Sequence, residues 1–148
     1  MALHWYTKRF DELTLLEWHD LLRLRIDVFV VEQNCPYPEL DGADLSALHV
    51  LALNGNDEVV AYARILPPGS DGHPHIGRVV VRMDHRRMNV ATQLLERALE
   101  VVGDTYGSHR SALAAQSHLE HFYARFGYER VGPDYPLDGI PHVDMVRK

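Results

Sequence analysis

Apolar residues recur along the first part of the chain at the spacing of an amphipathic helix. They stand three or four positions apart from residue 15 onward, so that one face is apolar. The members of this stripe are Leu15, Trp18, Leu21, Leu22, Ile26 and Phe29. Thr14 and Glu17 form a capping box, in which each side chain accepts a hydrogen bond from an otherwise unpaired amide at the helix start. We therefore predict a first helix that begins after Thr14.

Six shorter segments have the apolar, partly β-branched composition of strands. They cover residues 48–53, 59–66, 76–82, 111–115, 128–131 and 142–146. The Asn-Gly-Asn-Asp sequence between the first two predicts a hairpin. The run Val79-Val80-Val81 predicts a strand that is buried on both faces, as central strands are. A turn-rich loop from Asn34 to about Ala47 joins the first helix to these strands.

Two further helices lie between the later strands. One carries apolar residues at helical spacing and is expected to stop at Gly103. The other is expected to open with a second capping box, Ser117 with Glu120, and to stop at Gly127. Strands followed by strand–helix–strand–helix–strand predict an α/β (α+β) fold, with a mixed central sheet of about six to seven strands flanked by helices. No repeat or linker divides residues 1–148, so we predict one domain.

Composition and charge exclude several classes of protein. With 148 residues, 46% of them hydrophobic and 24% charged, the chain resembles an ordinary globular domain. A net charge of −6 argues against a nucleic-acid partner and leans towards a cationic substrate. The single cysteine, Cys35, excludes an intrachain disulfide, and no segment is apolar enough for a membrane span, so we expect a cytoplasmic protein. The ten histidines are scattered without metal-ligand spacing, so no metal is expected.

The segment 79–92 is the best candidate for chemistry. It combines a buried strand, a tight loop with Arg86 and Arg87, and a helix that begins on small residues. Helix starts expose unpaired amides and a positive dipole end, which suits a phosphate or pyrophosphate. The alternative is an ordinary strand–loop–helix connection in which Asn89 caps the helix. The phosphate-loop pattern of nucleotide triphosphatases and the glycine pattern of dinucleotide folds are both missing from the sequence.

The same segment resembles the acetyl-CoA motif of the GNAT superfamily, Gln/Arg-x-x-Gly-x-Gly/Ala. Arg86, Asn89 and Ala91 fall on its three fixed positions. Other parts of the chain resemble the ElaA-like branch of that superfamily, in the same order along the sequence: residues 28–37, 41–44, 122–128 and 138–142. The family normally has glycine where Asn89 stands. Asparagine is the residue that best tolerates a positive φ after glycine, so cofactor binding remains compatible with this departure.

The resemblance implies the GNAT fold with a splayed strand pair at the acetyl-CoA site. It also implies an N-acetyltransferase that moves the acetyl group of acetyl-CoA to a primary amine, either a small molecule or a peptide. Homodimers are common in the family. Two alternatives are a non-catalytic acyl-CoA-binding module and an interaction domain without cofactor. The cofactor-binding residues implied are Val79, Val80, Val81, Arg86, Arg87, Met88, Asn89, Val90, Ala91, Thr92 and Gln116.

The catalytic groups are a second part of this expectation. Tyr123 occupies the general-acid position of the superfamily, although its sequence context alone would suit a packed aromatic residue. Glu32 is the candidate base, because an apolar setting would raise its pKa. The alternative is that Glu32 pairs with an arginine such as Arg25. His142 is a second candidate base.

Two other features have competing explanations. Cys35 as a nucleophile is disfavoured because no adjacent base is evident. Asp41 and Asp44 lack the spacing of a calcium loop and suit either turn formation or acceptor binding.

Overall fold

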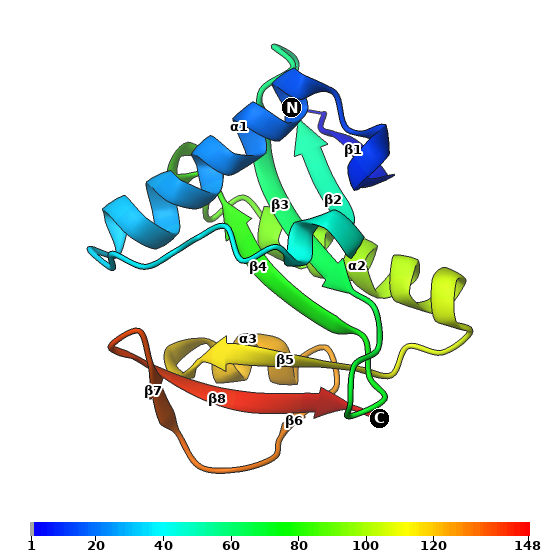
Figure 1. The fold of residues 1–148 in the computed structure, drawn as a ribbon, viewed down its shortest axis with the longest axis vertical. Coiled ribbons are helices and arrows are strands. Elements are labelled where there is room, and N and C mark those ends of the chain that lie inside the picture. Colours follow the sequence, from blue (N-terminus) through cyan, green and yellow to red (C-terminus); the bar gives the residue numbers. More distant parts are fainter. Residues whose placement is uncertain (1) are drawn as a thin grey trace.

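The computed structural model describes residues 2–148 and contains one eight-stranded mixed sheet (Figure 1). The strand order is β1-β2-β3-β4-β5-β8-β6, and β7 pairs with β8. The strands are β1 (His4–Arg9), β2 (Leu48–Leu53), β3 (Val59–Leu66), β4 (His75–Val81), β5 (Ser111–Gln116), β6 (Tyr128–Arg130), β7 (Tyr135–Leu137) and β8 (Ile140–Arg147). The helices are α1 (Leu15–Arg25), α2 (Val90–Tyr106) and α3 (Glu120–Ala124). Short helical segments are η1 (Phe10–Glu12), the π-helical η2 (Ile26–Glu32), η3 (Ala43–Ser46), η4 (Met83–His85) and η5 (Ser117–Leu119).

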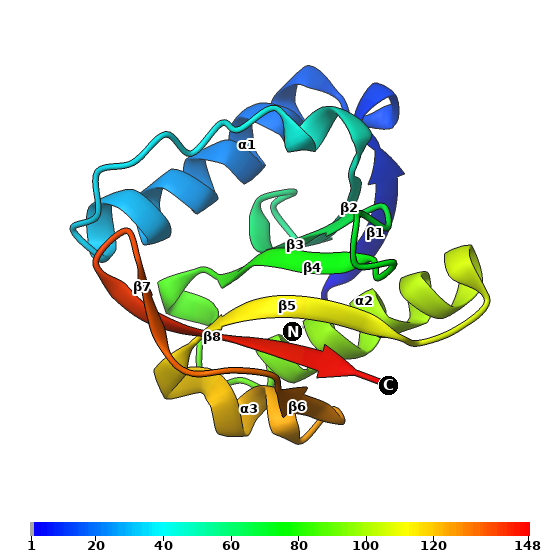
Figure 2. The same cartoon turned by 60° about the horizontal axis from the view of Figure 1, so that its bottom comes forward.

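The helices cover opposite faces of the sheet. Figure 2 shows α1 on one side of it, with α2 and α3 on the other. Alternation along β2 explains this, because Val50 and Ala52 join the core beneath α2, while Leu51 and Leu53 join the core beneath α1. Among residues 2–148, no helix is both long and apolar enough to cross a membrane.

The sheet opens between β4 and β5. These two parallel strands share one registered pair, His75 with Ala112, near the start of each strand. In β4 the register against β3 shifts, so that Arg78 and Val79 together face Ala63, and Arg78 takes a positive φ of 51°. A bulge of this kind bends its strand and increases the twist. The strands therefore separate towards Val81 and Gln116, where the cleft described below lies.

The prediction for the first helix is right about its start and partly wrong about its buried face. Its capping box, Thr14 with Glu17, is confirmed. The stripe is shifted, however, because Leu15 and Ile26 are exposed while Leu24 and the unexpected Arg25 are buried. From Ile26 onward the helix has π geometry, which changes which side chains face the sheet.

The predicted helix ends also need correction. Gly103 does not stop α2, which continues to Tyr106 and ends at Gly107, where φ is 74°. Gly103 lies inside the helix, where the ring of the exposed His109 approaches it: a Cβ there would lie 2.5 Å from Nε2, and the ring would have to move. The second capping box is wrong: the chain forms η5 and then α3, and the Ser117 hydroxyl is buried without a hydrogen-bond partner among residues 2–148.

The strand predictions hold with small shifts at the ends, and the hairpin between β2 and β3 is confirmed. Two strands were missed, so the sheet has eight strands rather than six or seven. The first, β1, is an edge strand rich in polar and basic residues, which is how many edges avoid further pairing. The second, β7, has only three residues and includes Pro136, which the sequence pattern assigned to a loop.

Candidate active site

A cleft of about 560 Å³ lies where β4 and β5 separate. Side chains from η2, β4, β5, the η5–α3 region and the start of β8 line it. The lining includes Glu32, Val79, Val81, Arg86, Gln116 and Tyr123, which are residues selected from the sequence. The fold therefore brings together in one cleft candidate groups that are up to 110 positions apart in the chain, from Glu32 to His142.

The edge of β4 presents backbone groups to this cleft. The amide of Arg82 donates to the carbonyl of Val60 in β3, at 2.8 Å. Because amides alternate in direction along a strand, those of Val79 and Val81 face the opposite, open side. The expectation that all three valines are buried is wrong: only Val80 is, and the other two are half-buried because they border the cleft.

The turn from β4 into α2 has the geometry that a glycine usually provides. Asn89 has φ 64° and ψ 15°, and Arg87 has φ 62°. The positive φ expected at Asn89 is thus confirmed. Its side chain makes no capping hydrogen bond, so the alternative in which that side chain caps the helix is wrong. The first helical bond runs from Gln93 to Asn89, at 3.2 Å, which leaves the preceding amides of α2 free for another acceptor.

Glu32 binds Arg86 across the mouth of the cleft. The Arg86 guanidinium donates two hydrogen bonds to the Glu32 carboxylate, at 2.8 and 2.9 Å, and a third to the carbonyl of Val81, at 3.0 Å. The hydrogen bonds from Arg86 hold the pKa of Glu32 below its ordinary value. The predicted rise in that pKa is therefore wrong. The alternative, that Glu32 pairs with an arginine, is confirmed, but the partner is Arg86 and not Arg25.

The next residue, Gln33, reaches the other wall of the cleft. Its side-chain amide and that of Gln116, at the end of β5, exchange two hydrogen bonds of 3.2 and 3.4 Å. Glu32 and Gln33 therefore contact both the turn before α2 and the end of β5. Any molecule that occupies the mouth of the cleft must share or replace these contacts.

Tyr123 lies on α3, is 6% exposed and lines the cleft. Its ring packs edge-on against Phe122 and, further away, against Tyr128, with centroid distances of 5.1 and 6.2 Å. Burial, and to a lesser extent Tyr128, raises the pKa of its hydroxyl well above the ordinary value. The hydroxyl is therefore protonated at neutral pH and can serve as a proton or hydrogen-bond donor there.

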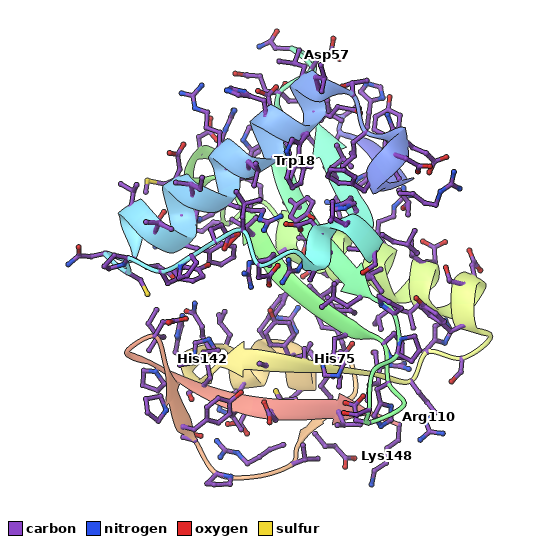
Figure 3. The ribbon with its side chains drawn as sticks, in the orientation of Figure 1. Trp18, Asp57, His75, Arg110, His142 and Lys148 are labelled. Atoms are coloured by element: carbon purple, nitrogen blue, oxygen red, sulfur yellow. The ribbon has the colours of Figure 1, made fainter. Side chains whose placement is uncertain are left out.

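His142 is the cleft residue best arranged as a base. Its Nδ1 lies 2.7 Å from the carbonyl oxygen of Ile140, which can only accept, so Nδ1 carries a proton and, in the neutral ring, the lone pair is on Nε2. In the sheet it stands opposite Gln116, and Figure 3 shows it near that end of β5, with His75 towards the other end. Cys35 also lines the cleft, and its thiol donates to the carbonyl of Asp138, at 3.2 Å.

A buried network of charges holds the loop between η2 and β2. Arg25, at the end of α1, is fully buried and binds Glu39 at 2.6 Å and Asp44 at 2.8 Å. Arg64 on β3 binds Asp44 at 3.1 Å and Asp41 at 2.7 Å. The arginines hold the pKa of both aspartates below the ordinary value, against the effect of burial. Asp44 therefore binds two buried arginines and is not available to an acceptor. The only indication of this network in the sequence is an arginine next to an apolar stripe.

The fold and the cleft together match a known class of acyltransferases. A family model described as an acetyltransferase (GNAT) domain matches residues 27–148. The chain belongs to the GNAT acetyltransferase family. It is 43% identical to Protein ElaA of Escherichia coli K12 over 149 aligned positions, covering 99% of this chain and 97% of that protein.

Solved structures agree with this assignment. An acyl-CoA N-acyltransferase from Pseudomonas aeruginosa has a TM-score of 0.94 at 41% identity, covering 99% of this chain and all of that one. E. coli ElaA has a TM-score of 0.92, also at 41% identity, with the same coverage. An aminoglycoside 6′-N-acetyltransferase complexed with coenzyme A shares the fold, with a TM-score of 0.71, 16% identity and 96% coverage of each chain. The predicted fold class and the resemblance to ElaA are confirmed.

Proposed function

We propose that this protein is an acetyl-CoA-dependent N-acetyltransferase whose acceptor is a primary amine. The observation that carries the proposal is the turn before α2, in which Arg87 and Asn89 adopt positive φ and the first helical amides lack partners among residues 2–148. Backbone of this shape suits a pyrophosphate, because the amides and the helix dipole both favour negative charge. The turn follows the splayed strand β4, and its Arg86 lines the cleft in which a thioester can lie, whereas residues 87–92 are outside the lining.

The cofactor would be held at three places. The amides of Val90, Ala91 and Thr92 would contact the pyrophosphate, together with Arg86 once it exchanges Glu32 for phosphate oxygens. Each such anion contact contributes about 0.3–2 kcal/mol, depending on burial. Arg87 and Met88 are exposed on the same turn and would lie beside the phosphates. Gln116 would bind the pantetheine arm, in place of its hydrogen bonds with Gln33.

The amides of Val79 and Val81 would polarise the thioester carbonyl, since both point into the cleft. An alkylammonium with a pKa of about 10.4 needs about 4–5 kcal/mol to lose its proton at pH 7, so the acceptor requires a base. Nε2 of His142 is free to take that proton.

Tyr123 would then donate its proton to the departing thiolate. Its pKa lies above that of a thiol, at about 8.5, so full transfer is uphill and the hydroxyl would act mainly by donating a hydrogen bond to the thiolate as it forms. Any tyrosinate that forms would recover its proton from water before the next cycle.

Removing the Tyr123 hydroxyl tests this assignment. We expect Tyr123→Phe to lower kcat by about 10²–10⁴-fold, the usual contribution of a positioned acid, while the Kd for acetyl-CoA stays unchanged. Thiol release from acetyl-CoA against a panel of amines measures turnover, and thermal stabilisation by acetyl-CoA measures binding. The matched control is Tyr106→Phe, at the far end of α2 and outside the cleft lining.

Two results would contradict parts of the proposal. Unchanged turnover in Tyr123→Phe would show that this tyrosine is not the acid. Stabilisation by acetyl-CoA without thiol release against any amine would instead favour the non-catalytic acyl-CoA-binding module.

A further inference from the structure

Arg78 occupies an unusual position on the wall of the cleft. It sits in the bulge of β4 with a φ of 51°, in the left-handed region that an arginine rarely adopts. Such a conformation is strained and persists only where the surroundings impose it. Its side chain is 21% exposed and lines the cleft, one residue before the amide of Val79. The strained backbone therefore places a guanidinium next to the proposed site of acetyl transfer.

The guanidinium is fixed along one edge and open along the other. Its Nε donates to the carboxylate of Glu39, at 3.0 Å, and its Nη2 donates to the backbone carbonyl of Glu39, at 3.3 Å. Nη2 also lies 3.5 Å from the carboxylate of Asp41, and the Tyr37 ring packs 5.8 Å away. Nη1 has no hydrogen-bond partner among residues 2–148, so two donors of a rigid, planar fork remain available.

An unpaired hydrogen-bond donor on this wall favours an anionic group at this point. Of the charged residues that line the cleft, Arg64, Arg78 and Arg86 are cationic, and Glu32 and Asp138 are anionic. Both oxygens of Glu32 already bind Arg86. Carboxylates at positions 39, 41 and 44, which are not part of the lining, balance the charges of Arg64 and Arg78. The feature that remains is therefore the unpaired Nη1 of Arg78, and not an excess of positive charge.

We infer that the acceptor is an amine that also carries a carboxylate, and that Arg78 binds this carboxylate through Nη1. The inference rests on the proposed function and narrows its substrate class to amino acids and related amino carboxylates. A carboxylate can accept a charge-assisted hydrogen bond from Nη1, the nitrogen of this guanidinium that is still free. Consecutive strand residues are about 3.3 Å apart, so a small molecule bound to Arg78 by its carboxylate can place an amine a few bonds away beside a thioester held at the amides of Val79 and Val81. Such an acceptor keeps the cationic amine towards which the acidic net charge leans.

Turnover with matched acceptors tests the inference. Thiol release from acetyl-CoA is measured for each of the twenty amino acids and for its primary amide, which lacks the carboxylate. For the best acceptor we expect at least a tenfold higher kcat/KM for the acid than for its amide. Arg78→Gln should remove that preference by lowering kcat/KM for the acid at least tenfold, while the amide and the KM for acetyl-CoA are unaffected. Arg78→Lys, which keeps the charge, should recover part of the loss.

Arg82→Gln is the matched control. Arg82 follows β4 directly and binds Asp84 and Glu58 outside the cleft lining. Its substitution should leave the preference for the acid intact. If Arg78 only clamped Glu39 and Asp41, its loss would instead lower turnover equally for acids and amides.

Direct binding separates this inference from the proposed function. Calorimetry in the presence of CoA compares N-acetylated amino acids with N-acetylated amino amides, on the wild-type protein and on both Arg78 variants. Tighter binding of the acids, lost in Arg78→Gln, supports the inference even if no amine releases thiol, a result that would refute only the acetyltransferase proposal. Equal binding and equal turnover of acids and amides by the wild-type protein would overturn the inference while leaving the acetyltransferase proposal standing.

Discussion

Two arginine–carboxylate sites in this protein have similar geometry and opposite surroundings. Arg25 binds Glu39 and Asp44 with contacts of 2.6 and 2.8 Å, and Arg86 binds Glu32 with contacts of 2.8 and 2.9 Å. The Arg25 side chain is 0% exposed, whereas those of Arg86 and Glu32 are 35% and 33% exposed. The two sites therefore differ in their exposure to solvent and not in the lengths of their hydrogen bonds.

Burial decides what each site can do. Removing one partner of a buried pair leaves a charge without compensation and costs about 3–5 kcal/mol, while an exposed pair contributes about 0.2–1 kcal/mol. The Arg25 network cannot exchange its carboxylates for a ligand, so it acts as a scaffold for the loop beside the cleft. Arg86 can exchange Glu32 for a phosphate at little cost. Similar ion pairs are thus structural in one place and replaceable in the other.

The largest effect is expected for Asp44→Asn, which leaves Arg25 and Arg64 without the carboxylate that joins them. We expect the free energy of unfolding at pH 7 to fall by about 3–5 kcal/mol. Urea denaturation measures it. Asp84→Asn is the control, because Asp84 also contacts an arginine and a histidine but is exposed, and its loss should hardly change the denaturation midpoint. Comparable midpoints for the two variants would contradict the distinction between the sites.

The effect of Asp44→Asn on stability should depend on pH. The arginines lower the pKa of Asp44 in the folded protein. A carboxylate with a depressed pKa contributes stability above the ordinary aspartate pKa of about 3.9, and this contribution is lost as the pH falls through the lower, folded value. The stability difference between wild-type protein and Asp44→Asn should therefore be full at pH 7 and shrink below about pH 4.

The two sites also differ in how far the sequence could predict them. The turn before α2 is local: Arg86, Asn89 and Ala91 stand within six residues, so spacing and the need for positive φ were readable. Tyr123 was placed by family resemblance, and the structure puts it in the same cleft.

The contacts between distant segments could not be predicted in this way. Glu32 meets Arg86 across 54 positions, and Gln33 meets Gln116 across 83, and no periodic pattern encodes such pairs. Arg25 was missed for a different reason. A charged residue next to an apolar stripe is expected to point outward, and its burial depends on carboxylates supplied by the later loop.

The backbone of the turn that carries Arg86 gives a second test of the comparison. Asn89 holds φ 64°, which a residue with an ordinary Cβ adopts at a cost of about 1–2 kcal/mol. Compared with Asn89→Gly, we therefore expect Asn89→Ala to be less stable, to bind CoA more weakly, or both. The losses in unfolding free energy and in binding free energy should add up to about 1–2 kcal/mol. Denaturation and calorimetry measure the two parts. Equal behaviour of the alanine and glycine variants would show that the turn does not need this φ.

The smallest effect is expected for Glu32→Gln, which removes the exposed carboxylate and frees Arg86. An exposed pair contributes about 0.2–1 kcal/mol, so the Kd for CoA should fall by about 1.4- to 5-fold at low salt. Because surface charges are screened, the gain should shrink as the ionic strength approaches 1 M. Calorimetry at two salt concentrations measures both effects.

The same substitution decides between the two candidate bases. Arg86 stabilises Glu32 as an anion of lowered pKa, which makes it a weak acceptor for an ammonium proton at neutral pH, so kcat of Glu32→Gln should stay within a few-fold of the wild type. His142→Gln keeps an amide near the carbonyl of Ile140 but removes the free Nε2, and its kcat should fall by about 10²-fold or more. If the two results are reversed, Glu32 is the base despite its arginine partner. The ion pair between Glu32 and Arg86 would then have to open before catalysis. Its opening would control the base, and would not only free Arg86 for a phosphate.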